Sequence, residues 1–331
     1  MAINFTGEYN DDFKFKPQPW TPFQDQEVMK RLAAMTPEEL VQHPNPDFHI
    51  TIMDSVGAYE IADMFAEIKA SDDFDKKFTF ICGNPNPDTY IPVAELINNH
   101  NVNCRNIHPF TMDEWADDQG HIAPLTDRSG FSYSFMKYFY MRIREDLRPP
   151  IENITMPNNE NISYYSDLID ECGEGGCDVL YAGPGWAGHI AFIDPCPELI
   201  PGYKEGGEYI LKSLDDPYFQ QKAQVLTLHP LTIAQNSLHG VFGCSGAVGM
   251  VPPKAATIGP RDVLHAKKRY ENHALSTMGS FSSWQRMTSR LICHGPVTPY
   301  VPGSMFQLME THVHVSPNIA KPIEVLETVG Y

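Results

Sequence analysis

The sequence lacks any apolar run near the ~20 residues that a membrane-spanning helix needs, so we expect no membrane insertion. Positive charge is also scarce. The chain has 24 Lys and Arg against 42 Asp and Glu, giving a formal net charge of −18. Because nucleic-acid binding depends on clustered Lys and Arg, we expect no nucleic-acid partner.

Paired cysteine motifs are absent as well. The seven cysteines are odd in number and include no C-x-x-C pair, which indicates neither a disulfide framework nor a zinc site. The polar, acidic start of the sequence resembles no secretory signal, so we predict a cytoplasmic protein. His312 and His314 would share one face of a strand, but no third ligand lies nearby in sequence, and we predict no metal site.

The order of elements predicts an α/β domain over residues 47–331, preceded by an extension over residues 1–46 that is rich in Pro, Asp and Gln. Strand and helix patterns alternate from residue 48, which is typical of a doubly wound, mostly parallel sheet with helices on both faces. One longer helix is expected over 131–144. Strands are predicted at 49–53, 78–82, near Thr111, and at 178–182, 224–228, 255–258 and 312–315.

In such sheets, ligands bind beyond the carboxyl ends of the strands. This rule selects four loops, at residues 83–88, 111–115, 183–189 and 259–262.

Two adjacent acids stand in the second of these loops. Side chains of neighbouring residues in a strand point to opposite sides, so only one of Asp113 and Glu114 would face a pocket. We take Asp113 as the candidate base. The alternative is a solvated acidic turn or a helix cap.

A glycine-rich turn precedes His189. Gly183, Gly185 and Gly188 follow a short apolar strand and allow a ligand to approach the backbone closely. Imidazole titrates near neutral pH and suits acid–base chemistry, and Asp194 is placed to hold its tautomer. The alternative is a structural histidine.

Three blocks together resemble the glucosamine-6-phosphate deaminase (isomerase) family, in its order and spacing. They are Phe110-Thr-Met-Asp-Glu-Trp, Phe131-Ser-Tyr-Ser-Phe-Met and Gly183-Pro-Gly-Trp-Ala-Gly-His-Ile-Ala-Phe-Ile-Asp-Pro. The resemblance spans roughly residues 48–320. It implies a Rossmann-like fold, isomerisation of an aldose to a ketose with loss of ammonia, no cofactor, a sugar or sugar phosphate as substrate, and a homo-oligomer.

The same resemblance implies roles for individual residues. Asp113 would take the proton from C2 of the opened sugar, His189 would assist ring opening, and Asp194 would stand for a family glutamate that tunes the histidine. The residues expected to bind substrate are Gly83, Asn84, Asn86, Glu114, Gly185, Trp186 and Arg261.

The departures from the family pattern concern ring opening and phosphate binding. Ala187 stands where the family has an aspartate of the ring-opening apparatus. The phosphate turn reads Gly83-Asn-Pro-Asn-Pro87, and its prolines remove N–H donors. Arg261, after the strand at 255–258, is hypothesised to bind an anion; the alternative is an intramolecular ion pair.

Two other functions remain open from the sequence. His189 alone could activate water against a lactone, as expected of a 6-phosphogluconolactonase on the same scaffold. A protein that binds sugar without catalysis would be consistent with Ala187.

Overall fold

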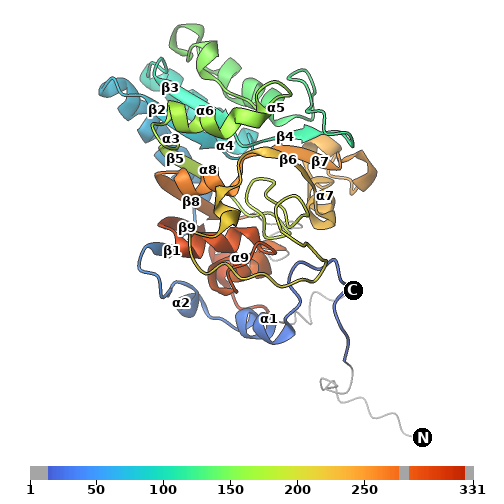
Figure 1. Ribbon diagram of the computed structural model, residues 1–331. Helices are drawn as coiled ribbons and strands as arrows, with labels where there is room; N and C mark the ends of the chain where they lie inside the picture. The colour runs from blue at the N-terminus through green and yellow to red at the C-terminus, as the bar shows by residue number, and fades with distance from the viewer. Residues whose placement is uncertain (1–13, 276–282, 325–331) are drawn as a thin grey trace, which may run out of the picture.

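The computed structural model describes residues 14–275 and 283–324. Its central sheet has the strand order β1-β9-β8-β5-β2-β3, with every neighbouring pair parallel (Figure 1). The predicted parallel sheet is therefore confirmed. Its strands are β1 (Phe48–Ile52), β2 (Phe78–Cys82), β3 (Ile107–Thr111), β5 (Val179–Ala182), β8 (Lys268–His273) and β9 (Thr311–Val315).

Helices cover both faces of this sheet, because its strands alternate side chains between two apolar cores. In β2, Phe80 faces the core shared with α3 and α4, whereas Ile81 faces the core shared with α6, α8 and α9. The helices are α1 (Gln26–Ala33), α2 (Pro37–Leu40), α3 (Val56–Asp73), α4 (Pro87–His100), α5 (Phe131–Tyr138), α6 (Tyr165–Cys172), α7 (Pro230–Asn236), α8 (Pro260–His265), α9 (Gln285–His294) and α10 (Pro317–Ala320).

A second, antiparallel sheet corrects one expectation. The strands expected at 224–228 and 255–258 do not join the parallel sheet. They are β6 (Gln224–Thr227) and β7 (Lys254–Thr257); β7 pairs with β4 (Asp113–Ala116) on one side and with β6 on the other, in the order β4-β7-β6 (Figure 1). A strand's apolar content does not determine its partner. The pairing sets Asp113 opposite Thr257.

Two other elements differ from expectation. Strand β8 was missed because its sequence, KRYENH, is polar, although Arg269 is buried and satisfied by the backbone carbonyls of Val263, Leu264 and Glu310. The helix expected over 131–144 ends at Tyr138. A 3₁₀ turn over Tyr140–Arg142 follows it and keeps Phe139 and Ile143 buried.

The described part of the amino-terminal segment packs onto the domain. Leu32 in α1 and Leu40 in α2 are fully buried, and the Leu40 carbonyl lies 2.8 Å from His294 Nε2 in α9. A capping box between Thr36 and Glu39 starts α2, where the sequence predicts a helix start. Within the described ranges, no helix is long and apolar enough to cross a membrane.

Candidate functional site

Asp113 and the His189 loop meet at the edge formed by the carboxyl ends of β3 and β5. Asp113 begins β4 and is buried, and its Oδ1 accepts a 3.0 Å hydrogen bond from the Phe192 backbone N–H. The same N–H lies 3.1 Å from Thr257 Oγ1 in β7. Since Phe192 follows His189 by three residues, the two halves of the predicted site lie together.

The His189 ring is held from one side by a buried polar network. Its Nδ1 lies 2.7 Å from Asp194 Oδ1, and Thr232 Oγ1 in α7 lies 2.8 Å from both atoms. Asp194 Oδ2 also accepts the backbone N–H of His229 at 2.8 Å. With Nδ1–H donated to a carboxylate, Nε2 of the neutral ring is the acceptor and is the nitrogen available for proton transfer.

Two glycines leave the room that the His189 ring needs in this position. A Cβ on Gly185 would lie only 1.7 Å from His189 Nε2, so the backbone of the loop packs directly against the imidazole. Gly188 has a φ of +78°, a left-handed conformation that favours glycine, and its carbonyl accepts the Gly303 N–H at 2.7 Å. Both positions therefore require glycine.

Burial raises the pKa of Asp113 from 3.8 to about 7. Desolvation disfavours the ionised carboxylate, while hydrogen bonds from Thr257 and Phe192 and the charge of His189 act in the opposite direction. A carboxyl group with a pKa near neutrality can both accept and release a proton at physiological pH, as general acid–base catalysis requires.

Glu114 bonds backbone N–H groups of the protein, whereas the sequence analysis expected it to bind substrate. Its fully buried carboxylate accepts the backbone N–H groups of Trp115, Phe131 and Ser132, at 2.9, 3.2 and 2.8 Å. The last two open α5, where negative charge stabilises the helix N-terminus. Glu114 thus has the helix-capping role that the sequence left open for this acidic pair.

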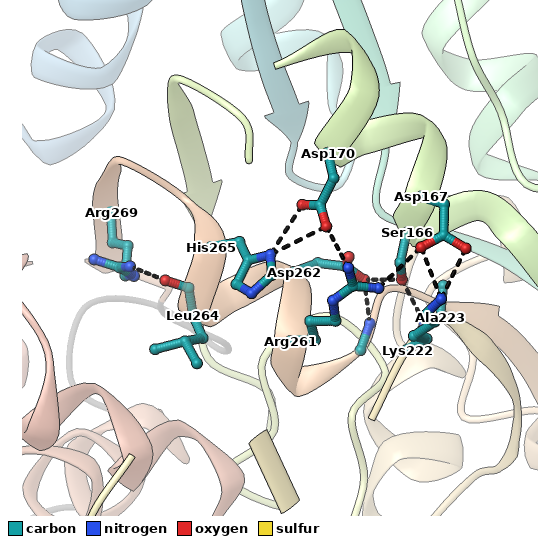
Figure 2. A network of polar contacts seen from close by, with 11 residues as sticks. Ser166, Asp167, Asp170, Lys222, Ala223, Arg261, Asp262, Leu264, His265 and Arg269 are labelled. Carbon is teal, nitrogen blue, oxygen red and sulfur yellow. Dashed lines mark hydrogen bonds and ion pairs between the residues drawn. The ribbon is translucent and has the colours of Figure 1, made fainter. Parts of the chain in front are cut away.

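Arg261 forms intramolecular ion pairs, which the sequence analysis gave as the alternative to anion binding (Figure 2). Its guanidinium bonds Asp167 at 3.0 Å and Asp170 at 2.6 Å, both in α6, and its side chain is only 18% exposed. Lys222 binds the same Asp167 at 2.7 Å. The structure does not bring Arg261 into contact with Asp113 or His189.

Replacing Arg261 with Met is therefore expected to leave ligand affinity unchanged and to lower the free energy of unfolding by about 1.5–3 kcal/mol, the usual contribution of hydrogen bonds to charged groups. Urea unfolding and ligand titration by calorimetry would measure the two effects. Lys222→Met, which removes an exposed partner of the same carboxylate, is the matched control, with a loss below about 1 kcal/mol. A tenfold loss of ligand affinity in Arg261→Met would restore the anion-binding role.

The loop after β2 lies at the same sheet edge as the His189 loop. Gly83 follows Cys82 and packs against the Tyr181 carbonyl, which a Cβ would approach to 3.0 Å. Asn84 and Asn86 are exposed, and Asn86 Oδ1 caps α4 by accepting the Thr89 N–H at 2.9 Å.

Trp186 is the exposed residue of the His189 loop. It is 37% exposed and stacks on Trp284, with ring centroids 6.3 Å apart and 13° between planes. Its backbone N–H donates to Gln235 Oε1 at 2.7 Å, and its backbone carbonyl accepts from Thr288 Oγ1 at 3.4 Å. The adjacent Ala187 is buried.

Sequence reasoning missed three further ionisable groups, Glu271, His273 and His239. Glu271 and His273 lie in β8, fully buried, with Glu271 Oε1 3.4 Å from His273 Nε2 and His273 Nδ1 2.7 Å from Ser289 Oγ. Glu271 and His239 both interact electrostatically with His189. Glu271 was missed because the polar strand that holds it, β8, was not recognised.

Neither the two surface cavities nor His312 adds to the candidate site. Two surface cavities, of about 390 and 480 Å³, flank residues 122–124, and neither is lined by Asp113 or His189. His312 stacks on His49 rather than joining a ligand set. Within residues 14–275 and 283–324, no group of three or more His, Cys, Asp and Glu is arranged to hold a metal.

Comparisons with known proteins were informative only at the level of structure. No protein-family model matches the sequence, and no curated protein matches it. A monomeric glucosamine-6-phosphate deaminase superposes with a TM-score of 0.61 at 20% identity, covering 82% of this chain and 98% of that one.

Two 6-phosphogluconolactonases superpose with TM-scores of 0.52 at 14% identity. The one from Thermotoga maritima covers 81% of this chain and 99% of its own, and the one from Trypanosoma cruzi covers 82% and 95%. These likenesses confirm the α/β fold that the sequence motifs imply. The chain therefore shares its fold with a glucosamine-6-phosphate deaminase and with 6-phosphogluconolactonases.

Proposed function

We propose that this protein converts an aldose amino sugar to a ketose with release of ammonia, the reaction type implied by the deaminase resemblance. The observation that carries the proposal is the buried assembly in which Asp194 and Thr232 fix the His189 ring beside Asp113. It supplies two proton-transfer groups from two loops at one sheet edge, which is the position where ligands of parallel α/β sheets bind.

The two groups divide the proton transfers between them. His189 Nε2 takes the proton of the C1 hydroxyl and returns it to the ring oxygen, which breaks the C1–O5 bond and opens the sugar. Asp113 then removes the proton from C2 and delivers it to C1 through an enol-type intermediate, while the amine gives up one proton and the C1 oxygen gains one, so that C1 becomes a hydroxymethyl group and C2 an imine. The C2 imine that results adds water and loses ammonia, so that amino sugar and water give ketose and ammonia.

Ala187 shapes how ring opening proceeds in this proposal. The carboxylate expected two residues before the histidine is replaced by a buried methyl group, so Asp194 is the carboxylate that bonds His189, with Thr232 as the second group that orients the ring. We therefore expect ring opening to be the slow step.

The proposal is tested by measuring ammonia release, and by following the aldose and ketose by NMR, across a panel of amino sugars and their phosphates. Asp113→Asn removes the base and should abolish both signals. Asp118→Asn, at an exposed acid five residues along the chain, is the control and should retain them. Ammonia release that survives in Asp113→Asn would exclude Asp113 as the base.

Lactone hydrolysis is the second candidate, because a histidine oriented by a carboxylate is also sufficient to activate water. It needs no base at C2. A lactonase would keep its activity in Asp113→Asn and lose it in His189→Gln, and the same two variants therefore separate the two reactions.

The pH dependence follows from Asp113. Its carboxyl group must be ionised to accept the C2 proton, so turnover should rise with pH through about 7. Stability should move in the opposite direction. A folded pKa raised above the unfolded value contributes stability at low pH that is lost as pH rises towards 7. Kinetics and urea unfolding of wild type and Asp113→Asn between pH 5 and 8 would measure both. A wild-type profile flat through that window would contradict the assignment.

A further inference from the structure

The charged side chains around His189 bear on which class of sugar this site binds. All 24 Lys and Arg lie in the described residues, because residues 1–13, 276–282 and 325–331 contain neither type. Within that part of the chain, none of them forms a hydrogen bond or ion pair with Asp113, His189 or Asp194. Phosphate recognition ordinarily relies on such cations.

The buried and half-buried arginines are already committed to protein groups. Arg261 is paired with Asp167 and Asp170. Arg290 donates to four backbone carbonyls, at residues 286, 319, 320 and 321. Recruiting either one to a phosphate would leave buried partners unsatisfied.

Backbone donors do not replace these cations in the loop after β2. The N-terminus of α4 would attract an anion, but Asn86 Oδ1 already accepts the Thr89 N–H, and Pro85 and Pro87 have no N–H. Asp88 adds a negative charge in the first turn. This helix end therefore disfavours a second anion.

The site is instead rich in carboxyl groups. Asp113, Asp194 and Glu271 are all buried, and Glu271 lies within β8, opposite Ala182, the last residue of β5 before the His189 loop. Both Glu271 oxygens are buried, and Oε1 lies 3.4 Å from His273 Nε2, at ion-pair distance but outside hydrogen-bond geometry. Three acids within one site favour a cation and oppose a phosphate.

An aromatic surface marks the exposed side of the same loop. The indole of Trp186 is stacked on Trp284, which fixes its orientation and leaves it 37% exposed. Such a face binds the apolar C–H side of a sugar, and it attracts a ligand cation through the ring quadrupole.

We infer that the ligand is an unphosphorylated amino sugar, whose ammonium group is bound by the carboxyl groups of the site and whose ring lies on Trp186. This inference rests on the proposed function and narrows its substrate class. It differs from the phosphorylated sugars in the names of the structural neighbours.

The test is calorimetric titration of the full chain with glucosamine, galactosamine, the matching hexoses, and the 6-phosphate of each. One of the two free amino sugars should bind at least about tenfold more tightly than its 6-phosphate and than its hexose, a difference of about 1.4 kcal/mol. Trp186→Ala should weaken that binding about tenfold. Phe74→Ala, which removes an exposed aromatic at the end of α3, should leave it unchanged.

Each other outcome contradicts a specific part of the inference. Tighter binding and turnover of a 6-phosphate would overturn the inference and leave the proposed isomerase intact. Equal binding of hexose and hexosamine would remove the role of the ammonium group. If no sugar of the panel binds at millimolar concentration, and none releases ammonia, the inference and the proposed function both fail.

Discussion

Replacing His189 with Gln is expected to lower kcat for the preferred sugar by about 100- to 10,000-fold, the usual contribution of a positioned acid–base group. The structure gives the reason. The ring is oriented through Nδ1 by Asp194 and Thr232, and glutamine keeps an amide that can donate to Asp194 but cannot carry a proton at the Nε2 position. Steady-state kinetics of ammonia release would measure the effect.

The control for this variant is His121→Gln, which changes an exposed histidine paired with Asp117. It should leave kcat unchanged. Circular dichroism melts of both variants would show whether lost activity reflects lost folding. A His189→Gln enzyme that is folded and retains more than about half of its turnover would assign the chemistry to another group, with His239 the first to examine.

Replacing Gly185 with Ala is expected to have the second largest effect. The new methyl group would lie 1.7 Å from His189 Nε2 and 2.1 Å from Cε1, so the imidazole must leave its position and its 2.7 Å contact with Asp194 must break. Overpacking of this kind typically costs about 1–3 kcal/mol of stability. We expect that loss in urea unfolding, together with a fall in turnover comparable to that of His189→Gln.

Gly240→Ala is the matched control, since no atom lies within 4 Å of the Cβ that it would add. It should be nearly neutral in both measurements. If Gly185→Ala were as active and as stable as Gly240→Ala, the close packing of the loop backbone on the imidazole would be incorrect.

Much of the fold was predictable from local sequence. The run at Phe78–Cys82 is apolar except for Thr79, and it is a fully buried strand in the structure. The helix start at Thr36 is equally local, because a capping box needs only residues three apart. The motif at 183–189 placed a histidine at a strand end for the same reason: glycines permit a conformation that the local sequence alone dictates.

Partner choice was not predictable in this way. Strands β6 and β7 were recognised but placed in the wrong sheet, because β7 pairs with β4, more than 100 residues away, and β6 pairs with β7. The polar sequence of β8 hid a buried strand, and with it Glu271. The role of Arg261 was likewise undecided until α6 brought two acids beside it (Figure 2).

The sequence by itself determined the doubly wound α/β class, the scarcity of positive charge, and the identity of Asp113 and His189 as the groups with suitable chemistry. Only the tertiary structure decided their surroundings: Thr232 and Asp194 holding the ring, Glu114 capping α5, and burial raising the pKa of Asp113 to about 7. The physical reason is that residue type sets what a side chain can do, whereas pKa, orientation and charge balance depend on neighbours that the chain supplies from distant positions.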